Sequence, residues 1–166
     1  WRNVGLQQGS ITWDDYLEMG VLEALHAARD ISGADRVNAL GFCVGGTLLG
    51  AALAVFAAKG EDLVESVTYL TAMHDFADTG QIGLFVDENS VAQREAALGA
   101  GGILPGSDLA TVFSALRAND LIWPYVVNNY LLGRKPFPFD LLYWNQDSSR
   151  IAATCHSFYL REFYNE

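Results

Sequence analysis

The chain of 166 residues has few basic residues and only two cysteines. Ten Lys and Arg stand against 20 Asp and Glu, which gives a formal net charge of −10. Because nucleic-acid binding needs clustered Lys and Arg, this acidic balance without a basic run makes the chain a poor candidate for it, and we predict no nucleic-acid partner. Cys43 and Cys155 can form one disulfide at most, which excludes a disulfide scaffold. We predict that both are thiols in a reducing compartment.

The sequence also lacks a hydrophobic run that could cross a membrane. Its longest apolar stretch, Thr47 to Ala58, falls short of the roughly 20 residues that a spanning helix needs, and we predict a buried core helix there. The opening residues have no charged-then-apolar layout, which argues against a signal peptide. There is no initiator Met, and the last residues still follow a helical pattern. We therefore expect a piece of a longer protein.

What is present is a globular composition in which helix and strand signals alternate. Hydrophobic residues make up 51% and charged residues 18%, as in a folded domain. Thr12 can cap a helix that runs to about Ile31, and residues 44–58 predict a second helix that ends at a glycine. Residues 36–42 and 65–72 predict short strands. This alternation predicts an α/β fold with a parallel sheet and right-handed crossovers.

The pattern becomes mostly helical after residue 74. Helices are predicted over 87–98, 107–116, 121–132, 140–144 and 155–164. Ser107 is the expected cap of the second of these, and Pro124 is tolerated in the first turn of the third. We therefore predict two domains: residues 1–74 as a partial α/β core, and residues 75–166 as a mostly helical cap region that ends with the start of a return to the core.

The turn between the first strand and the second helix carries the strongest chemical signal. Its sequence, GFCVGG at residues 41–46, has the spacing of a nucleophile elbow with Cys in place of Ser. At such a bend the residues two before and two after the nucleophile are pressed together, so Gly41 and Gly45 are expected there. Gly46 lets the new helix pack closely on the strand. The alternative interpretation is a structural cysteine in a glycine turn.

The position of Cys43 favours a nucleophile over that alternative. The bend places its sulfur over the first turn of a helix, where free N–H groups and the helix dipole favour an anion. The backbone N–H of Val44 then becomes an oxyanion-hole donor.

A thiol nucleophile also needs a general base, and the sequence offers three histidines. His26 precedes the turn, on the first helix, and is expected to be a surface or packing residue. His74 and His156 both follow the nucleophile in the chain, as the base does in this class of site. The sequence around neither histidine, however, predicts a loop at the end of a strand. Both stay open as candidates.

Other kinds of site are not indicated. The cysteines and histidines have no metal-ligand spacing, and the glycines at 99–102 are not followed by the Lys-Ser/Thr of a phosphate loop. We expect no metal and no cofactor. A late group of aromatic residues is expected in the core, or else along an apolar channel or a subunit contact; its members are Trp123, Tyr125, Tyr130, Phe137, Phe139, Tyr143 and Trp144.

Several segments together resemble the polyhydroxyalkanoate synthases, most closely class I. They are GFCVGGT, DFADTG, FVDE, NDLIWPYVVNNYL, PFDLLYWNQD and HSFYLREFY, in one register over essentially the whole chain. The resemblance implies an α/β-hydrolase core with an inserted cap, and an acyltransferase that polymerises (R)-3-hydroxyacyl-CoA. It implies an acyl-cysteine on Cys43, release of coenzyme A, and 3-hydroxybutyryl-CoA as the expected monomer. It also implies a homodimer at the surface of cytoplasmic storage granules, in contact with the growing polyester chain.

The resemblance also assigns residues beyond the nucleophile. Asp120, Trp123 and Asn145 match residues near the family's active-site entrance. The family's catalytic Asp and His follow the SFYLR segment and would come after Glu166, so we expect an internal fragment that is inactive by itself. Two other interpretations stay open: a cysteine-dependent hydrolase or thioesterase that uses one of the later histidines, and a non-catalytic piece whose aromatic helices serve association.

Overall fold

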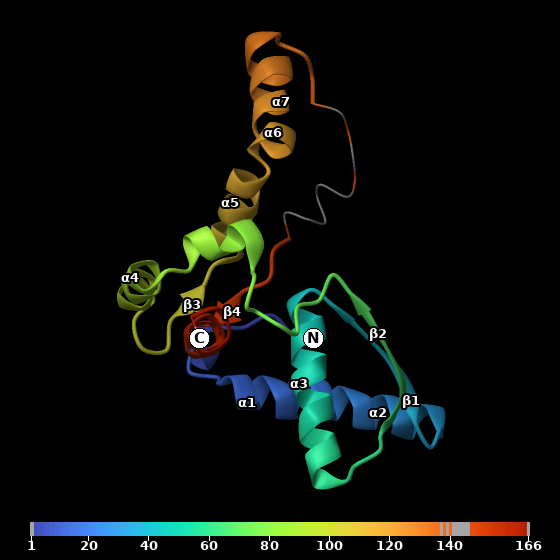
Figure 1. Ribbon diagram of the computed structural model, residues 1–166. Coiled ribbons are helices and arrows are strands. Elements are labelled where there is room, and N and C mark those ends of the chain that lie inside the picture. Colours follow the sequence, from blue (N-terminus) through green and yellow to red (C-terminus); the bar gives the residue numbers. More distant parts are fainter. Residues whose placement is uncertain (1, 137, 139, 141–146, 166) are drawn as a thin grey trace. The chain divides into compact units, whose positions relative to one another are not determined.

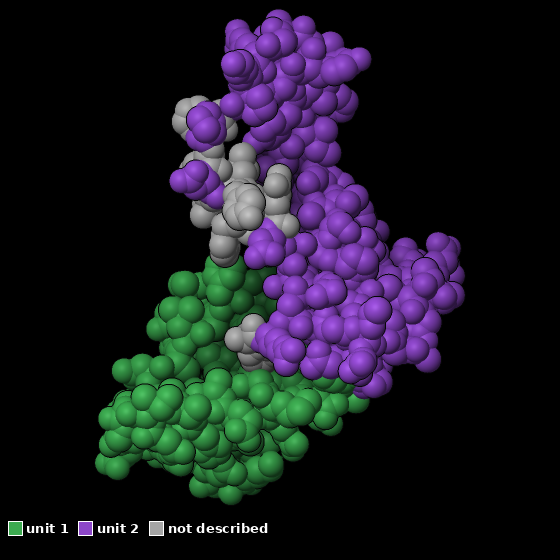
Figure 2. All heavy atoms as spheres, turned by 180° about the vertical axis from the view of Figure 1, so that it is seen from behind, with its two compact units in different colours: residues 1, 11–78 green, residues 2–10, 79–166 purple. Residues whose placement is uncertain are grey.

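The computed structural model describes residues 2–136, 138, 140 and 147–165, which form two compact units (Figure 2). Unit 1 holds residues 11–78, and unit 2 holds residues 2–10 together with the described residues from 79 onward. The first ten residues, which we placed with the core, join unit 2 through backbone hydrogen bonds. Arg150 N–H donates to Asn3 Oδ1 at 2.8 Å, and Thr154 N–H donates to the Gly9 carbonyl at 3.3 Å. The assignment of functional domains stays a prediction.

Unit 1 consists of a long helical stretch, two strands and a further helix (Figure 1). The elements are α1 (Trp13–Asp15), the π-helical η2 (Tyr16–Leu22), α2 (Glu23–Ser32), β1 (Val37–Phe42), α3 (Val44–Lys59) and β2 (Val64–Leu70). The helical stretch begins at the predicted cap, because Thr12 Oγ1 accepts from Asp15 N–H while the Asp15 carboxylate accepts from Thr12 N–H. It ends at Gly33, which takes the left-handed conformation with φ 67°.

The two strands of unit 1 pair in parallel, and the predicted α/β arrangement is confirmed. The ladder ends with the pairs Gly41–Tyr69 and Phe42–Leu70. One buried cluster joins α2, α3 and the loop before β2, with Val37 and Ala39 of β1 packed against it; its buried members are Leu25, Ala52, Phe56 and Leu63. Since α2 and α3 pack beside β1, the sheet and this apolar cluster hold the junction between β1 and α3 in place.

Helix α3 is less buried than the sequence predicts. The stretch from Thr47 to Ala58 buries only part of its surface, and Val55 is 39% exposed. The reason is geometric: within the described residues of unit 1, only one side of the helix faces the cluster formed with α2 and the sheet. An evenly apolar composition therefore does not reveal which side of the helix is covered.

Unit 2 is mostly helical (Figure 1). Its elements are η1 (Leu6–Gln8), η3 (Gly80–Phe85), α4 (Glu88–Leu98), β3 (Ile103–Leu104), α5 (Gly106–Leu116), α6 (Ala118–Leu121), α7 (Trp123–Tyr125), the π-helical η4 (Val126–Leu131), β4 (Ile151–Ala152), α9 (Ala153–Tyr159) and the π-helical η5 (Leu160–Tyr164). Strands β3 and β4 pair in antiparallel fashion and were not predicted, because two residues are too few for a periodic signal. Most of the helix predicted over 140–144 lies outside the described residues.

In unit 2 one predicted helix cap is wrong, and one of the alternatives for the late aromatic group is overturned. Ser107 does not cap α5: the capping position is Pro105, and the Ser107 hydroxyl donates instead to Asp108 at 3.4 Å. The described aromatic residues of the late group are exposed rather than in the core: Trp123 by 56%, Tyr125 by 43% and Tyr130 by 83%. The alternatives for this group, an apolar channel or a subunit contact, stay predictions. The other members, Phe137, Phe139, Tyr143 and Trp144, lie outside the described residues.

Candidate active site

Cys43 lies at the corner between β1 and α3, exposed to solvent. It is the N-cap residue of α3, with φ 54° and ψ −130°. A non-glycine residue with positive φ is strained by roughly 1–3 kcal/mol and is found mainly where surrounding contacts enforce it. Its backbone is held from both sides, because Cys43 N–H donates to the Leu70 carbonyl at 3.0 Å and the Cys43 carbonyl accepts from Gly46 N–H at 2.9 Å.

The glycines that are in close contact at this corner are not the expected pair, Gly41 and Gly45. A Cβ atom on Gly41 would lie 2.5 Å from the Gly46 Cα, and one on Gly46 would overlap the Ala72 side chain. A Cβ atom on Gly45 would meet no described atom within 4 Å. The close pair is therefore Gly41 with Gly46, because the first turn of α3 brings residue 46 back over the end of β1. The steric role expected of Gly45 is wrong.

The backbone N–H groups that follow Cys43 belong to the first turn of α3. Val44 is the first residue of this helix, where an N–H group has no carbonyl four residues earlier within the helix. A helix of 16 residues adds the positive end of its dipole at the same place. The corner thus combines an exposed sulfur with free amide donors, an arrangement that can stabilise negative charge on an acyl oxygen.

The segment after β2 forms the neighbouring part of this edge of the sheet. Thr71, the first residue after β2, has φ 47°, and with Cys43 it makes up the non-glycine residues of positive φ in the described chain. Thr47 on α3 donates its hydroxyl to the Met73 carbonyl at 2.8 Å. Sequence reasoning missed Thr47; the available signal was a lone hydroxyl at the start of an otherwise apolar stretch.

The two candidate bases lie in different compact units. In unit 1, His74 is exposed and its ring packs edge to face on Tyr69, with 4.3 Å between ring centroids. It also lies against Gly50, where an added Cβ would come within 2.8 Å of the imidazole. His26 is half-buried on α2. None of the hydrogen bonds described for unit 1 joins an imidazole to Cys43.

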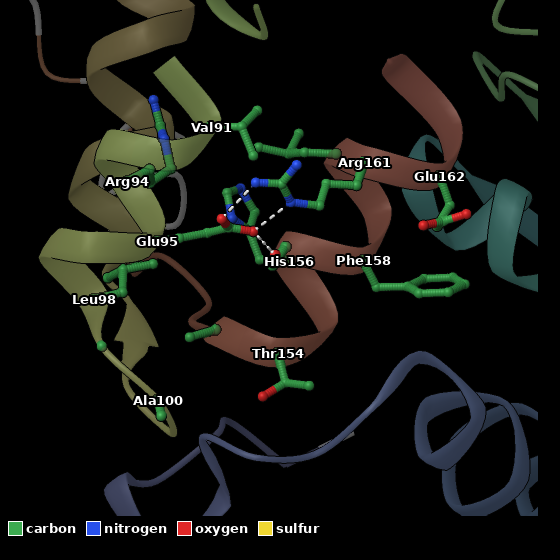
Figure 3. Close-up of a pocket in the computed structure, with 14 residues that line it drawn as sticks. Val91, Arg94, Glu95, Leu98, Ala100, Thr154, His156, Phe158, Arg161 and Glu162 are labelled. Atoms are coloured by element: carbon green, nitrogen blue, oxygen red, sulfur yellow. Dashed lines mark hydrogen bonds and ion pairs between the residues drawn. The ribbon is translucent and has the colours of Figure 1, made fainter. Parts of the chain in front are cut away.

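His156 is buried in unit 2, where it lines a cavity of about 440 Å³ between α4 and α9 (Figure 3). Burial, with a smaller contribution from the positive charge of Arg94, lowers the pKa of His156 to about 4. The imidazole is therefore neutral at neutral pH. Next to it in sequence, burial raises the pKa of the Cys155 thiol to about 12, so this cysteine remains protonated.

An ion-pair group fastens α4 to the C-terminal helices beside this cavity (Figure 3). The Arg161 guanidinium donates to both Glu95 oxygens, at 2.8 and 2.7 Å, and to Glu88 at 2.9 Å, while Ser157 donates to Glu95. Arg161 and Ser157 lower the pKa of Glu95 to about 2. No local sequence signal links residues so far apart in the chain, which is why this group was not predicted.

The residues expected at an active-site entrance are only partly described. Asp120 on α6 accepts a hydrogen bond from Arg117 at 2.8 Å, and Trp123 is the exposed first residue of α7. Asn145 lies outside the described residues. Both described residues belong to unit 2, and their proximity to an active site stays a prediction.

The described residues include no group of three His, Cys, Asp or Glu side chains that could hold a metal ion. Among the helices described, none has the length and apolar character needed to cross a membrane.

The sharp strand-to-helix corner with a strained cysteine has the geometry of a nucleophile elbow. Residues 1–161 match the alpha/beta hydrolase fold family. The chain therefore belongs to this family, and its fold is part of an α/β-hydrolase core with a mostly helical addition.

Within this class the chain is similar to polyester polymerases. It is 52% identical over 169 aligned residues to the poly(3-hydroxyalkanoate) polymerase subunit PhaC of Cupriavidus necator, covering 99% of this chain and 29% of that protein. It is 47% identical to the subunit PhaC of Rhizobium meliloti, over 100% of this chain and 27% of that protein. The resemblance to the polyhydroxyalkanoate synthases is thus confirmed, and the chain spans less than a third of the length of these relatives.

Proposed function

We propose that this chain carries the nucleophile of an acyltransferase that polymerises (R)-3-hydroxyacyl-CoA, with 3-hydroxybutyryl-CoA as the expected substrate. The observation that carries the proposal is the exposed Cys43 at a strand-to-helix corner with φ 54°. The similarity to named poly(3-hydroxyalkanoate) polymerases supports the choice of substrate class.

In the first step, the Cys43 thiolate attacks the thioester carbonyl carbon of the substrate. A bond forms between the sulfur and this carbon while the carbonyl oxygen takes up negative charge, which the N–H of Val44 and a second backbone donor stabilise. The carbon–sulfur bond to coenzyme A then breaks, and coenzyme A leaves as a thiolate that takes up a proton. Because one thioester replaces another, the acyl group stays activated, which a serine ester would not achieve.

In the second step, the 3-hydroxyl of another acyl unit attacks the acyl-cysteine and lengthens the polyester. A general base takes the hydroxyl proton, and Cys43 leaves as the thiolate. We propose that this base and its orienting acid come from residues outside this 166-residue sequence, as the resemblance implies. In support, His74 packs on Tyr69 without a described hydrogen bond to Cys43, and His156 is buried with its pKa lowered to about 4. We expect the inserted cap that the resemblance implies to be apolar and to keep water from the acyl-cysteine. We further propose that the intact enzyme acts as a homodimer on cytoplasmic granules.

The experiment compares the chain alone with a hybrid synthase, in which the chain replaces the matching segment of the Cupriavidus necator relative. Both are mixed with (R)-3-hydroxybutyryl-CoA, and coenzyme A release, free acid and polymer are measured. We expect polymer from the hybrid, no polymer from its Cys43→Ala variant, and negligible turnover by the chain alone.

Other outcomes separate the alternatives. Free acid without polymer indicates a thioesterase, whereas polymer at full rate from Cys43→Ala removes Cys43 from the mechanism. Polymer formation by the chain alone would contradict a base from outside it. The matched control is Cys155→Ala, which we expect to retain activity because that thiol is buried and protonated.

A further inference from the structure

Thr47 is a polar residue in an apolar helix, and it is only 4% exposed. A buried hydroxyl is costly unless it is hydrogen-bonded, and in a helix it usually bonds to the carbonyl four residues earlier. Here Oγ1 bonds outside its own helix, to the Met73 carbonyl at 2.8 Å, 26 residues further along the chain. The hydroxyl therefore joins the first turns of α3 to the segment after β2.

That segment lies beside the nucleophile. Strands β1 and β2 are parallel, and their last pair is Phe42 with Leu70. The residues that follow this pair are Cys43 and Thr71, and both have positive φ. Thr71 is β-branched, so its backbone conformation is strained and must be enforced by its surroundings. The two strained residues thus follow neighbouring strands at the same edge of the sheet.

Two contacts enforce the path of the segment after Thr71. The Ala72 side chain fills the space over Gly46, where an added Cβ would overlap it. The next residue, Met73, is held by the Thr47 hydroxyl. Both contacts come from α3, within one turn of Cys43, so the same helical turn positions the nucleophile and the segment beside it.

We propose that Thr47 is a positioning residue for Cys43, and this inference rests on the proposed function. Its hydrogen bond to Met73 keeps Thr71 in the left-handed conformation and so fixes the backbone on one side of the sulfur. Thr47 does not touch the substrate. Without the hydroxyl, the segment after β2 relaxes, and the sulfur loses its alignment with the N–H groups of α3. Since a shift of about 1 Å can slow a reaction by up to about 100-fold, we expect kcat to fall by about 10- to 100-fold with little change in KM.

The test uses Thr47→Val, which keeps the shape of the side chain and removes the donor. In the hybrid synthase we expect the stated loss in kcat, and in the chain alone a slower reaction of Cys43 with iodoacetamide. Thr47→Ser keeps the donor and should restore both rates to within about threefold of the parent. The matched control is Thr68→Val on β2, because the Thr68 side chain is exposed and makes no described hydrogen bond.

A double variant separates positioning from mere folding. Thr71→Gly removes the strain that the hydrogen bond opposes, because glycine adopts positive φ freely. The proposal therefore predicts that Thr47→Val with Thr71→Gly folds and recovers most of the kcat that Thr47→Val loses. If the double variant is as impaired as Thr47→Val, or does not fold, Thr47 has only a structural role and the proposal is overturned. It is equally overturned if Thr47→Val retains the parent kcat.

Cys43→Ala distinguishes this inference from the function on which it rests. If that variant still makes polymer, the proposed function fails. If it makes none while Thr47→Val is fully active, the proposed function stands and only the positioning role fails.

Discussion

The two compact units hold a cysteine in opposite ways. In unit 1, Cys43 is exposed at a corner of the chain, with a strained backbone and helix N–H groups next to it. In unit 2, Cys155 is buried within the regular helix α9, and burial raises its pKa to about 12. Because only the thiolate is nucleophilic, backbone placement makes the same side chain available for chemistry in one unit and inert in the other.

The units also differ in what holds them together near these cysteines. In unit 1, the backbones of Gly41 and Gly46 lie in close contact, and the Thr47 hydroxyl donates a hydrogen bond to the Met73 carbonyl. Unit 2 relies on charge, through Arg161 between Glu88 and Glu95. Substitutions that alter side-chain size should therefore affect unit 1 most, whereas changes of charge or pH should affect unit 2 most.

The largest expected contrast is in thiol reactivity. With a pKa of about 12, about one in 10⁴ Cys155 thiols is ionised at pH 8, and the side chain is also shielded. We expect iodoacetamide to modify Cys43 at least about 100-fold faster than Cys155, as measured by peptide mass spectrometry over time. The Cys43→Ala and Cys155→Ala variants each lack one of the two modified peptides and so show which cysteine gives which signal. Equal rates would show that the two sites do not differ as described.

A second contrast is the acid sensitivity that His156 gives to unit 2. Its pKa is lowered from 6.5 to about 4, so below pH 6.5 the unfolded state binds a proton that the folded state does not. The free energy of unfolding should therefore fall by up to about 3 kcal/mol as the pH drops from 6.5 to 4. Urea titrations should show this slope in the parent and a flatter one in His156→Leu; identical slopes would contradict the assignment to His156.

The contribution of Glu95 to the free energy of unfolding should be lost at a lower pH than that of His156. Its pKa is held at about 2, so its stabilisation is complete above about pH 4.5 and is lost as the pH falls towards 2. This loss remains in His156→Leu, which separates the two groups.

The steric contrast at the elbow is tested by moving one methyl group between neighbouring glycines. Gly46→Ala should destabilise the chain by about 1–3 kcal/mol, because the new Cβ overlaps Ala72. Gly45→Ala has open space and should be neutral or stabilising by up to about 1 kcal/mol. Thermal and urea unfolding measure both. Combining Gly46→Ala with Ala72→Gly should recover part of the loss; no recovery would place the clash elsewhere.

The smallest contrast lies between the two carboxylates on Arg161. Glu95→Gln removes the charge of a half-buried carboxylate that accepts two hydrogen bonds from Arg161, and it should lower the free energy of unfolding by about 1–2 kcal/mol. Glu88→Gln removes a more exposed single contact and should cost less than about 0.5 kcal/mol. Urea unfolding with 0.1 and 1 M salt measures both, and the Glu88 effect should vanish at high salt. Similar costs for the two would show that burial does not matter here.

Short sequence patterns of a few residues were sufficient to predict several local features of this protein. The capping pair Thr12 and Asp15, the glycine that ends α3 and the spacing of GFCVGG each depend on residues that are neighbours in sequence. Such features form through local backbone geometry, so they can be read before any tertiary contact is known. The parallel α/β order followed from these elements taken in sequence.

Contacts between distant segments decided the rest. Gly46 rather than Gly45 is crowded because Ala72 arrives from the end of another strand, and Thr47 finds its acceptor only where that strand ends. Likewise, Arg161 meets Glu95 across 66 residues, and only packing decides that Cys155 is buried while Cys43 is exposed. Burial, ion pairing and steric crowding depend on which surfaces meet in the folded chain, and short-range sequence patterns do not predict those contacts.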